Sequence, residues 1–143
     1  MKSDFEENFV GRVAQKVIIS NKGNILVTHG INDAGLWELP GGHLNVEESA
    51  HEGLSREVFE ELGLDIEIGA LVYSEQFIHP SYNARALLLV FEASLKEGSN
   101  QITLDTGELS EYRWISKEQI EEQVFHPEYR RALDKYFSNN VEL

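Results

Sequence analysis

The pattern of hydrophobic and polar positions along the chain predicts six β-strands. Two apolar-rich stretches near the N-terminus are separated by residues 21–24, Asn-Lys-Gly-Asn, a composition typical of a tight turn. Two longer stretches in the second half flank a loop that contains Pro80. The predicted strands are 12–20, 25–29, 70–77, 84–95, 101–104 and 111–115.

A helix is predicted between Ser49 and Gly63. Ser49 and Glu52 have the S-x-x-E spacing of a capping box, which marks a helix start, and glycine favours the position just past a helix end. Between them, apolar residues recur at every fourth position and form one stripe, which indicates an amphipathic helix. These apolar residues are Ala50, Leu54, Val58 and Leu62.

Two further signals predict helices near the C-terminus. Ser116 and Gln119 repeat the capping-box spacing and open a short helix that reaches about Gln123. His126 and Pro127 introduce a final helix, because proline suits the first helical turn. Strands interleaved with a few helices predict a layered α/β fold with a mixed sheet.

The polar face of the first predicted helix carries crowded acids. Glu57, Glu60 and Glu61 have i, i+3 and i+4 spacing and therefore share one side. Like charges at these spacings destabilise a helix by roughly 0.2–0.5 kcal/mol per pair, and Arg56 offsets only part of this. Clustered carboxylates are ligands that suit Mg²⁺ or Mn²⁺. The alternative interpretation is a solvated acidic face with one Arg56–Glu60 ion pair.

The turn ahead of this helix favours a metal site over a solvated face. Residues 39–42, Leu-Pro-Gly-Gly, combine a rigid proline with two glycines, which let main-chain groups approach a ligand closely. Glu48 lies just ahead of the helix and joins the acids if the loop folds back. A glycine turn that leads into an acid-bearing helix therefore predicts a built site for a divalent cation.

One segment resembles the Nudix box of the Nudix hydrolase family. The motif is carried by Gly42, Glu48 and residues 56–64, all at the spacing of the box. Residues 37–41 and 112–115 are also similar to the corresponding segments of the family. The resemblance implies a Nudix-type α/β/α sandwich with a mixed β-sheet. It also implies metal-dependent cleavage of a diphosphate linkage in a small nucleotide derivative.

The resemblance further implies a role for each acid. Arg56 would orient the carboxylates, and Glu48 would lie beside them or bind a second metal ion. Mg²⁺ is the implied cofactor, with Mn²⁺ as the alternative. The implied metal ligands are Glu57, Glu60, Glu61 and Glu48, together with the backbone carbonyl of Gly41.

The resemblance leaves the general base open. In some relatives the base lies in the box, which makes Glu57 and Glu60 candidates. Arg56, which would orient these acids, is a further candidate catalytic residue. In others it is an acid on a later loop, where Glu108 is the candidate and Glu111 the alternative. Both loop residues are equally well explained as ordinary surface acids.

Three residues outside the box are candidates for binding substrate. Trp37 would stack on a base or, alternatively, cover the core. Arg12 and Arg85 would bind phosphate from the sheet or remain solvated. His29 stands where relatives often place an arginine that touches phosphate, so this chain lacks that arginine.

Features outside the box indicate different substrates. The distance from Leu64 to Pro80 resembles that in ADP-ribose pyrophosphatases, whereas the distance from Leu64 to Tyr82 resembles that in dinucleoside polyphosphate hydrolases. The turn at 37–42 and the short chain are more similar to nucleoside triphosphate pyrophosphatases of MutT type, which we favour. A non-catalytic nucleotide-binding Nudix module is the rival interpretation.

Composition narrows the partners. The net charge of −13 argues against a nucleic-acid polymer, whose binding relies on Lys and Arg, although a bound metal would admit a small nucleotide. The chain has no cysteine, which excludes disulfides and thiolate sites, and its longest apolar run, 86–91, is too short to cross a membrane. The first residues lack the pattern of a signal peptide. We expect one cytoplasmic domain, residues 1–143, with no membrane partner; homodimers are frequent in the family.

Overall fold

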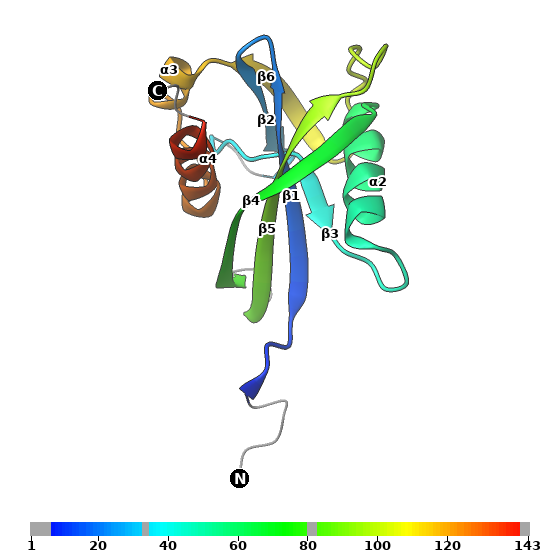
Figure 1. Cartoon of the computed structure of the whole chain (residues 1–143), viewed down its shortest axis with the longest axis vertical. Coiled ribbons are helices and arrows are strands. Elements are labelled where there is room, and N and C mark those ends of the chain that lie inside the picture. The colour runs from blue at the N-terminus through cyan, green and yellow to red at the C-terminus, as the bar shows by residue number, and fades with distance from the viewer. Residues whose placement is uncertain (1–6, 33–34, 80–82, 141–143) are drawn as a thin grey trace.

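A mixed β-sheet lies between two helical layers in the computed structural model, which describes residues 7–32, 35–79 and 83–140 (Figure 1). The fold is therefore the predicted α/β/α sandwich. The strands are β1 (Arg12–Asn21), β2 (Asn24–Gly30), β3 (Gly41–His43), β4 (Ile66–His79), β5 (Ala84–Leu95) and β6 (Leu109–Ile115). The helices are α2 (Ala50–Leu62), α3 (Lys117–Ile120) and α4 (Pro127–Asn139).

Two neighbouring strands near the centre of the sheet, β1 and β2, pair only at one end and leave a gap between them. The strands run in the order β4-β5-β1-β2-β6, with β1 and β5 parallel and the other neighbours antiparallel. The register of β1 with β2 covers Ser20↔Ile25 and Asn21↔Asn24, and the two strands then diverge. The segment that leads into β3 fills the space between them. Glu38 exchanges two backbone hydrogen bonds with Thr28 on β2, and Val17 on β1 donates to the Pro40 carbonyl.

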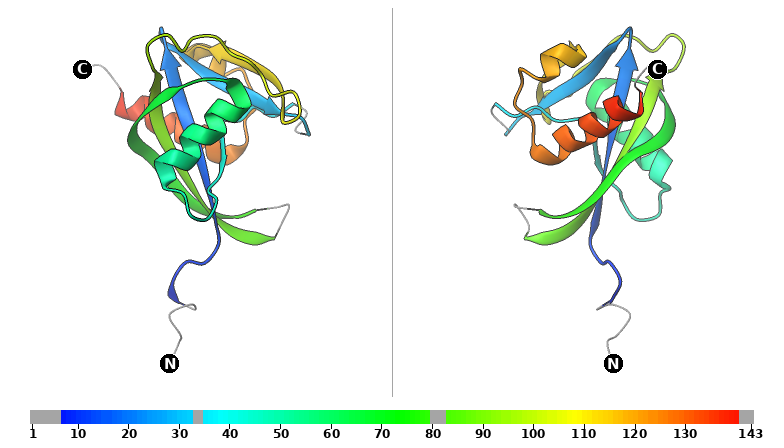
Figure 2. Two further views of the ribbon diagram at one scale, coloured as in Figure 1. Left: turned by 90° about the vertical axis from the view of Figure 1, so that its right-hand side faces the viewer. Right: turned by 60° about the vertical axis from the view of Figure 1, so that its left-hand side comes forward.

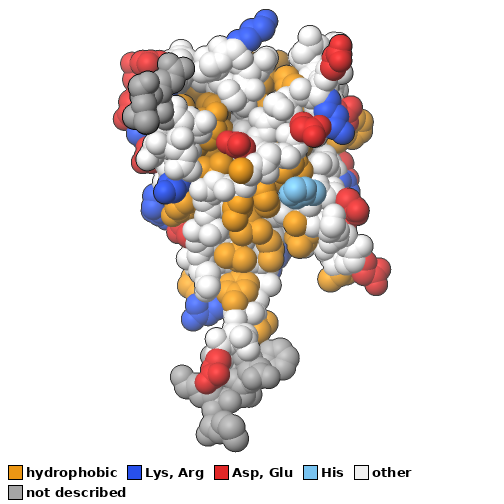
Figure 3. Space-filling model, viewed as in Figure 1, with side chains coloured by type: hydrophobic (Ala, Val, Ile, Leu, Met, Phe, Trp, Pro, Cys, Tyr) orange, Lys and Arg blue, Asp and Glu red, His pale blue; other side chains and the backbone are white. Residues whose placement is uncertain are grey.

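Alternation along the strands divides the core into two halves. Ala14 and Ile18 of β1 pack on the side of α3 and α4, whereas Val17 and Ile19 pack on the side of α2. Both views in Figure 2 place α2 and α4 on opposite faces of the sheet. Figure 3 shows hydrophobic side chains gathered over the region of β4 and β5, with charged side chains around them. Both faces of the central strands are covered, so the sheet is a firm support for the segment that leads into β3.

The sequence signals for α2 are confirmed in atomic detail. The Ser49 hydroxyl accepts a hydrogen bond from the Glu52 N–H, at 3.2 Å from oxygen to nitrogen, and Gly63 ends the helix in the left-handed conformation with φ 70°. Leu54, Val58 and Leu62 are fully buried against the sheet. The helix is therefore fixed at both ends and along one side.

One predicted strand is absent from the structure, and one strand of the structure was not predicted. Residues 101–104 form no strand, because backbone donors there are used at the end of α2: Thr103 donates to the Leu62 carbonyl and Asp105 to the Glu61 carbonyl. These bonds satisfy carbonyls that a helix leaves without partners at its C-terminus. Conversely, β3 forms within the glycine turn, because it pairs with β1 in the register Lys16↔Gly41.

No helix in the described part of the chain is both long enough and apolar enough to cross a membrane.

Shortening a buried side chain of α2 should destabilise the protein far more than shortening an exposed one. Leu62 is fully buried, whereas Phe59 on the same helix is 56% exposed. We expect Leu62→Ala to lower the free energy of unfolding by roughly 2–5 kcal/mol, and Phe59→Ala to change it much less. Urea unfolding of both variants measures this, and equal losses would contradict the assignment of the core face.

Candidate functional site

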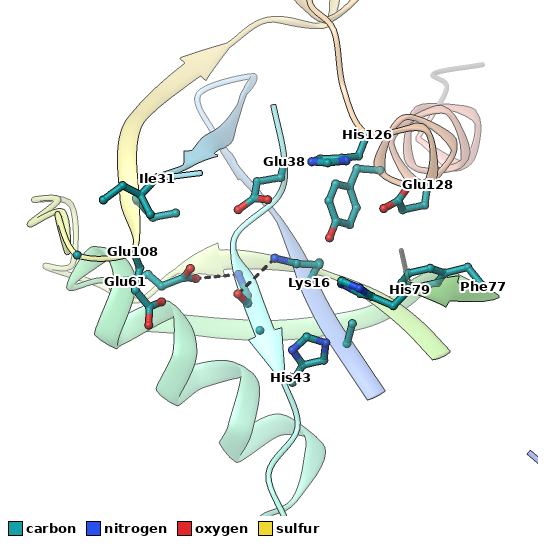
Figure 4. A pocket seen from close by; sticks show the side chains of 16 residues that line it. Lys16, Ile31, Glu38, His43, Glu61, Phe77, His79, Glu108, His126 and Glu128 are labelled. Carbon is teal, nitrogen blue, oxygen red and sulfur yellow. Dashed lines mark hydrogen bonds between the residues drawn. The ribbon is translucent and has the colours of Figure 1, made fainter. Parts of the chain in front are cut away.

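An open cavity of about 540 Å³ lies where β1 and β2 diverge (Figure 4). Glu61 and Glu108 line one side, and histidine and aromatic side chains line the other together with Glu128. The rings of the second side are Phe77, His79, His126 and Tyr129, and Glu38 lies between the two sides. Gly41 and Gly42 of β3 lie between the two sides and are part of the lining. The predicted glycine turn therefore forms part of the cavity wall.

Arg56 holds three of the predicted site acids at once. Its guanidinium donates two hydrogen bonds to Glu48, at 2.9 and 3.0 Å, and one each to Glu57 and Glu60, both at 3.2 Å. The hydrogen bonds from Arg56 and from the Asn45 N–H lower the pKa of Glu48. The loop ahead of α2 thus folds back as predicted and brings Glu48 to the other acids.

Two glycines make room that no side chain would leave. Gly41 has φ 138°, and a Cβ atom there would lie 2.1 Å from the Gln15 carbonyl oxygen on the paired strand. A Cβ atom on Gly42 would lie 2.6 Å from the carboxyl carbon of Glu57. Because neither gap admits another atom, the glycines let β3 pair with β1 and let the Glu57 carboxylate reach the backbone.

Glu61 is buried at the foot of the cavity. The residue is 5% exposed, and its Oε1 accepts a hydrogen bond from the Gly41 N–H at 3.0 Å. Burial raises the pKa of Glu61 to about 7, against the opposing influence of Lys16 and the Gly41 N–H. A carboxyl group of this kind ionises near neutral pH and becomes a strong ligand once a cation compensates its charge.

Glu57 lies close enough to Glu60 and Glu108 for their charges to repel. Burial is the main cause that raises the pKa of Glu57, and repulsion from Glu60 and Glu108 adds to it, against the lowering influence of Arg56. The Glu108 loop is anchored to the sheet region, since its carbonyl accepts from the Ile31 N–H at 2.9 Å. Figure 4 shows Glu61 and Glu108 on the same side of the cavity. Glu108 is therefore brought to the box acids, as the sequence suggested.

The alternative loop acid lies elsewhere. Glu111 is on β6, forms an ion pair with Arg113 at 3.0 Å, and does not line the cavity. Of the two loop candidates for a general base, the geometry favours Glu108.

The donor set has the chemistry of a site for a hard cation, although its side chains are held in ion pairs. The part of the chain that the structure describes contains no group of three or more His, Cys, Asp or Glu side chains already arranged around one metal position. Its oxygens come from the carboxylates of Glu57, Glu60 and Glu61 and from the carbonyl of Gly41, whose N–H donates to Glu61 and whose carbonyl accepts from Lys16. Oxygen donors and mutual repulsion fit Mg²⁺ or Mn²⁺, which would relieve the repulsion.

Trp37 is a core residue and not a lining residue of the cavity. It is 4% exposed, its indole N–H donates to Gln123 at 3.0 Å, and the His29 ring lies 3.6 Å from its ring centre. The Arg113 guanidinium lies 5.2 Å from the same ring. Of the two interpretations of Trp37, the structure supports the one in which it covers the core, because its ring is already covered by protein side chains.

The two candidate arginines lie outside the cavity lining. Arg12 begins β1 and Arg85 lies on β5, both with exposed side chains. Their predicted contact with phosphate stays a prediction. Pro80 and Tyr82, on which two substrate interpretations depend, lie outside the described residues.

Sequence reasoning missed the residues that form the rest of the cavity. Lys16 lies within the predicted first strand and is 8% exposed, while Phe77 and His79 end β4 and Tyr129 comes from α4. One signal was present: two polar residues, Gln15 and Lys16, interrupt the first predicted strand ahead of its apolar residues 17–19. The aromatic residues carried no such signal, because only the fold brings their strand and helix together.

Comparisons with known proteins agree with this geometry. The family model described as NUDIX domain matches residues 11–136. A MutT-like protein of Streptomyces ambofaciens is 27% identical over 118 residues, which cover 82% of this chain and 71% of that protein. Nudix hydrolase 2 of Arabidopsis thaliana is 31% identical over 116 residues, which cover 79% of this chain but 41% of that protein. The chain thus spans less than half the length of the Arabidopsis relative.

A solved structure shows the same fold. The NUDIX hydrolase from Nitrosomonas europaea superimposes with a TM-score of 0.77 at 21% identity, covering 91% of this chain and 90% of that one.

The raised pKa of Glu61 predicts a pH-dependent stability in the absence of metal. The folded protein keeps a proton on Glu61 that the unfolded chain loses near 4.5, so the free energy of unfolding falls between pH 4.5 and about 7 and then levels off. Glu61→Gln removes this ionisation and keeps an acceptor for the Gly41 N–H. We expect the variant to lose roughly 1–3 kcal/mol less than wild type between about pH 5 and about pH 8.

Urea unfolding in EDTA at these two pH values measures the difference. Glu67→Gln, a change at an exposed acid on β4, serves as the control and should behave as wild type. Identical pH dependence in wild type and Glu61→Gln would contradict a buried, protonated Glu61.

Proposed function

The chain belongs to the Nudix family, pyrophosphohydrolases that act on phosphoric anhydrides, and we propose that it hydrolyses a diphosphate linkage in a nucleoside triphosphate. The observation that carries the proposal is the complete acid set: Arg56 holds Glu48, Glu57 and Glu60, the Glu57 carboxylate lies against Gly42 of the cavity wall, and Glu61 lines the cavity itself. The apolar stripe of α2 and the hydrogen bond from Gly41 to Glu61 account for the attachment of this helix to the sheet, so its packing does not require Glu48, Glu57 or Glu60. Their arrangement is therefore best explained by chemistry.

Glu57, Glu60 and Glu61, with the Gly41 carbonyl, are the proposed holders of Mg²⁺ or Mn²⁺. A bound divalent ion supplies charge neutralisation at phosphate oxygens and makes water more acidic. The protein's part is positional. Arg56 fixes the carboxylates in one orientation, and the Gly41 N–H fixes Glu61, so that the oxygens need not be ordered when the ion enters.

The attacking water needs a base within hydrogen-bond reach. Glu108 is the proposed base from the loop, because it lines the cavity and its charge acts on Glu57. Glu60 is the alternative within the box: its side chain is 56% exposed and remains available to water. In either assignment the proton of the water passes to a carboxylate oxygen as the new P–O bond forms. The anhydride P–O bond breaks in the same displacement, and the bridging oxygen leaves with the departing phosphate group.

The opposite side of the cavity suits a nucleoside. Phe77, His79 and Tyr129 offer ring faces and edges, which accept a base by stacking. The similarity to a MutT-like protein supports the MutT-type interpretation of the sequence, for which a nucleoside triphosphate is the expected substrate. An ADP-ribose derivative, a nucleotide sugar or a dinucleoside polyphosphate is the alternative, since the cavity is open and would admit a second group.

The rival proposal is a Nudix module that binds a nucleotide without cleaving it. Calorimetry that shows binding of metal and nucleotide, with no product from a broad nucleotide panel, would favour this rival.

Removing one carboxylate charge should abolish most of the activity. We expect Glu60→Gln to lower kcat about 100-fold or more, because the variant loses a charged ligand of the metal ion that neutralises the reacting phosphate. Glu118→Gln on α3, a matched change at an exposed acid, should leave kcat unchanged. The assay is a nucleotide panel with Mg²⁺, followed by phosphorus NMR in oxygen-18 water, which also identifies the phosphorus attacked. Full activity in Glu60→Gln would contradict its role.

A further inference from the structure

Lys16 places a buried positive charge on the floor of the substrate cavity. It lies on β1 opposite Gly41, is 8% exposed, and donates a hydrogen bond from Nζ to the Gly41 carbonyl at 3.3 Å (Figure 4). Among the described residues that line the cavity, Lys16 is the only lysine or arginine. A buried lysine is rare unless it has partners, so this position calls for an explanation.

The surroundings keep the ammonium charged. Its Nζ lies 5.5 Å from the centre of the Tyr129 ring. Burial lowers the pKa of Lys16, but attraction to Tyr129, Glu38 and Glu61 outweighs it and raises the pKa overall. Lys16 is therefore a fixed cation in a cavity whose other charged groups are mostly acids.

The backbone of Gly41 forms hydrogen bonds with two side chains of the site. The Gly41 carbonyl accepts from Lys16, while the Gly41 N–H donates to Glu61 at 3.0 Å. Gly41 is held at this position by its pairing with Lys16 on β1, and a Cβ atom there would lie 2.1 Å from the Gln15 carbonyl oxygen, so no other residue fits. Any cation that approaches the Gly41 oxygen therefore meets the Lys16 ammonium.

We propose that Lys16 is a built-in cation that competes with the divalent metal ion for the Gly41 carbonyl and so weakens metal binding at that oxygen. The inference rests on the proposed function, because it assumes that the metal site includes Gly41 and Glu61. Two positive charges beside one oxygen repel, and a poorly solvated site screens this repulsion less than water does. In the metal-free protein Lys16 offsets part of the negative charge of the acids, and the same positive charge lowers the affinity of the site for a metal ion.

Mn²⁺ binding, measured without nucleotide at neutral pH by electron paramagnetic resonance, tests the proposal independently of hydrolysis. Lys16→Met keeps an unbranched side chain of similar length but removes the charge and the donor. We expect the Kd for Mn²⁺ to fall about tenfold in this variant. Lys135→Met, which removes one charge from an exposed position on α4, is the control and should bind as wild type.

A Kd for the folded Lys16→Met protein that is less than about threefold below that of wild type would overturn the proposal. Circular dichroism establishes that the variant is folded. If Lys16→Met does not fold, Lys16→Gln retains a donor for the Gly41 carbonyl without charge, and the same threshold applies. Absence of Mn²⁺ binding in wild type and variants alike would overturn the proposed metal-dependent function itself. Equal binding in all of them would overturn the role of Lys16 alone.

Discussion

Repulsion among the carboxylates on the polar side of α2 and in the loop ahead of it is the constraint on which the rest of the site depends. Arg56 holds Glu48, Glu57 and Glu60 through four hydrogen bonds, but one guanidinium cannot neutralise three acids and a fourth, Glu61, that is buried nearby. An isolated helix would be destabilised by this crowding. The helix persists because its opposite side is buried in the core and both ends are capped. The fold thus stabilises an electrostatic arrangement that could not exist alone.

The divergence of β1 and β2 turns this strained helix into a site. The segment between the strands brings the backbone of Gly41 and Gly42 against the acids, where a side chain would collide with Glu57 or with β1. Backbone N–H and carbonyl groups then face the cavity from a sheet that cannot easily move. Lys16 on β1 and Glu61 on α2 bind the carbonyl and the N–H of the same residue, so that a basic and an acidic side chain meet at Gly41. Binding chemistry and strand pairing are therefore parts of one structure.

Features that depend on neighbouring residues were predictable from the sequence, and features that depend on distant partners were not. The ends of α2 follow from Ser49 and Gly63, and the acid spacing follows from helical geometry. The strand at Gly41–His43 escaped prediction because its partner lies on β1, more than twenty residues away. For the same reason, segment 101–104 looked like a strand, whereas its donors complete the end of α2. For Trp37 the sequence left stacking on a base and covering the core as alternatives, and the residues that place it in the core, Gln123 and Arg113, come from elsewhere in the chain.

The central claim is that the carboxylates around Gly41 are arranged for a divalent cation and are unfavourably crowded without one. The midpoint of thermal unfolding, measured above neutral pH in EDTA and at increasing Mg²⁺, tests it most directly. Binding to the native state alone should raise the midpoint as Mg²⁺ increases, while KCl at the same ionic strength should raise it much less. A midpoint that responds equally to KCl and to Mg²⁺, or to neither, would contradict the account.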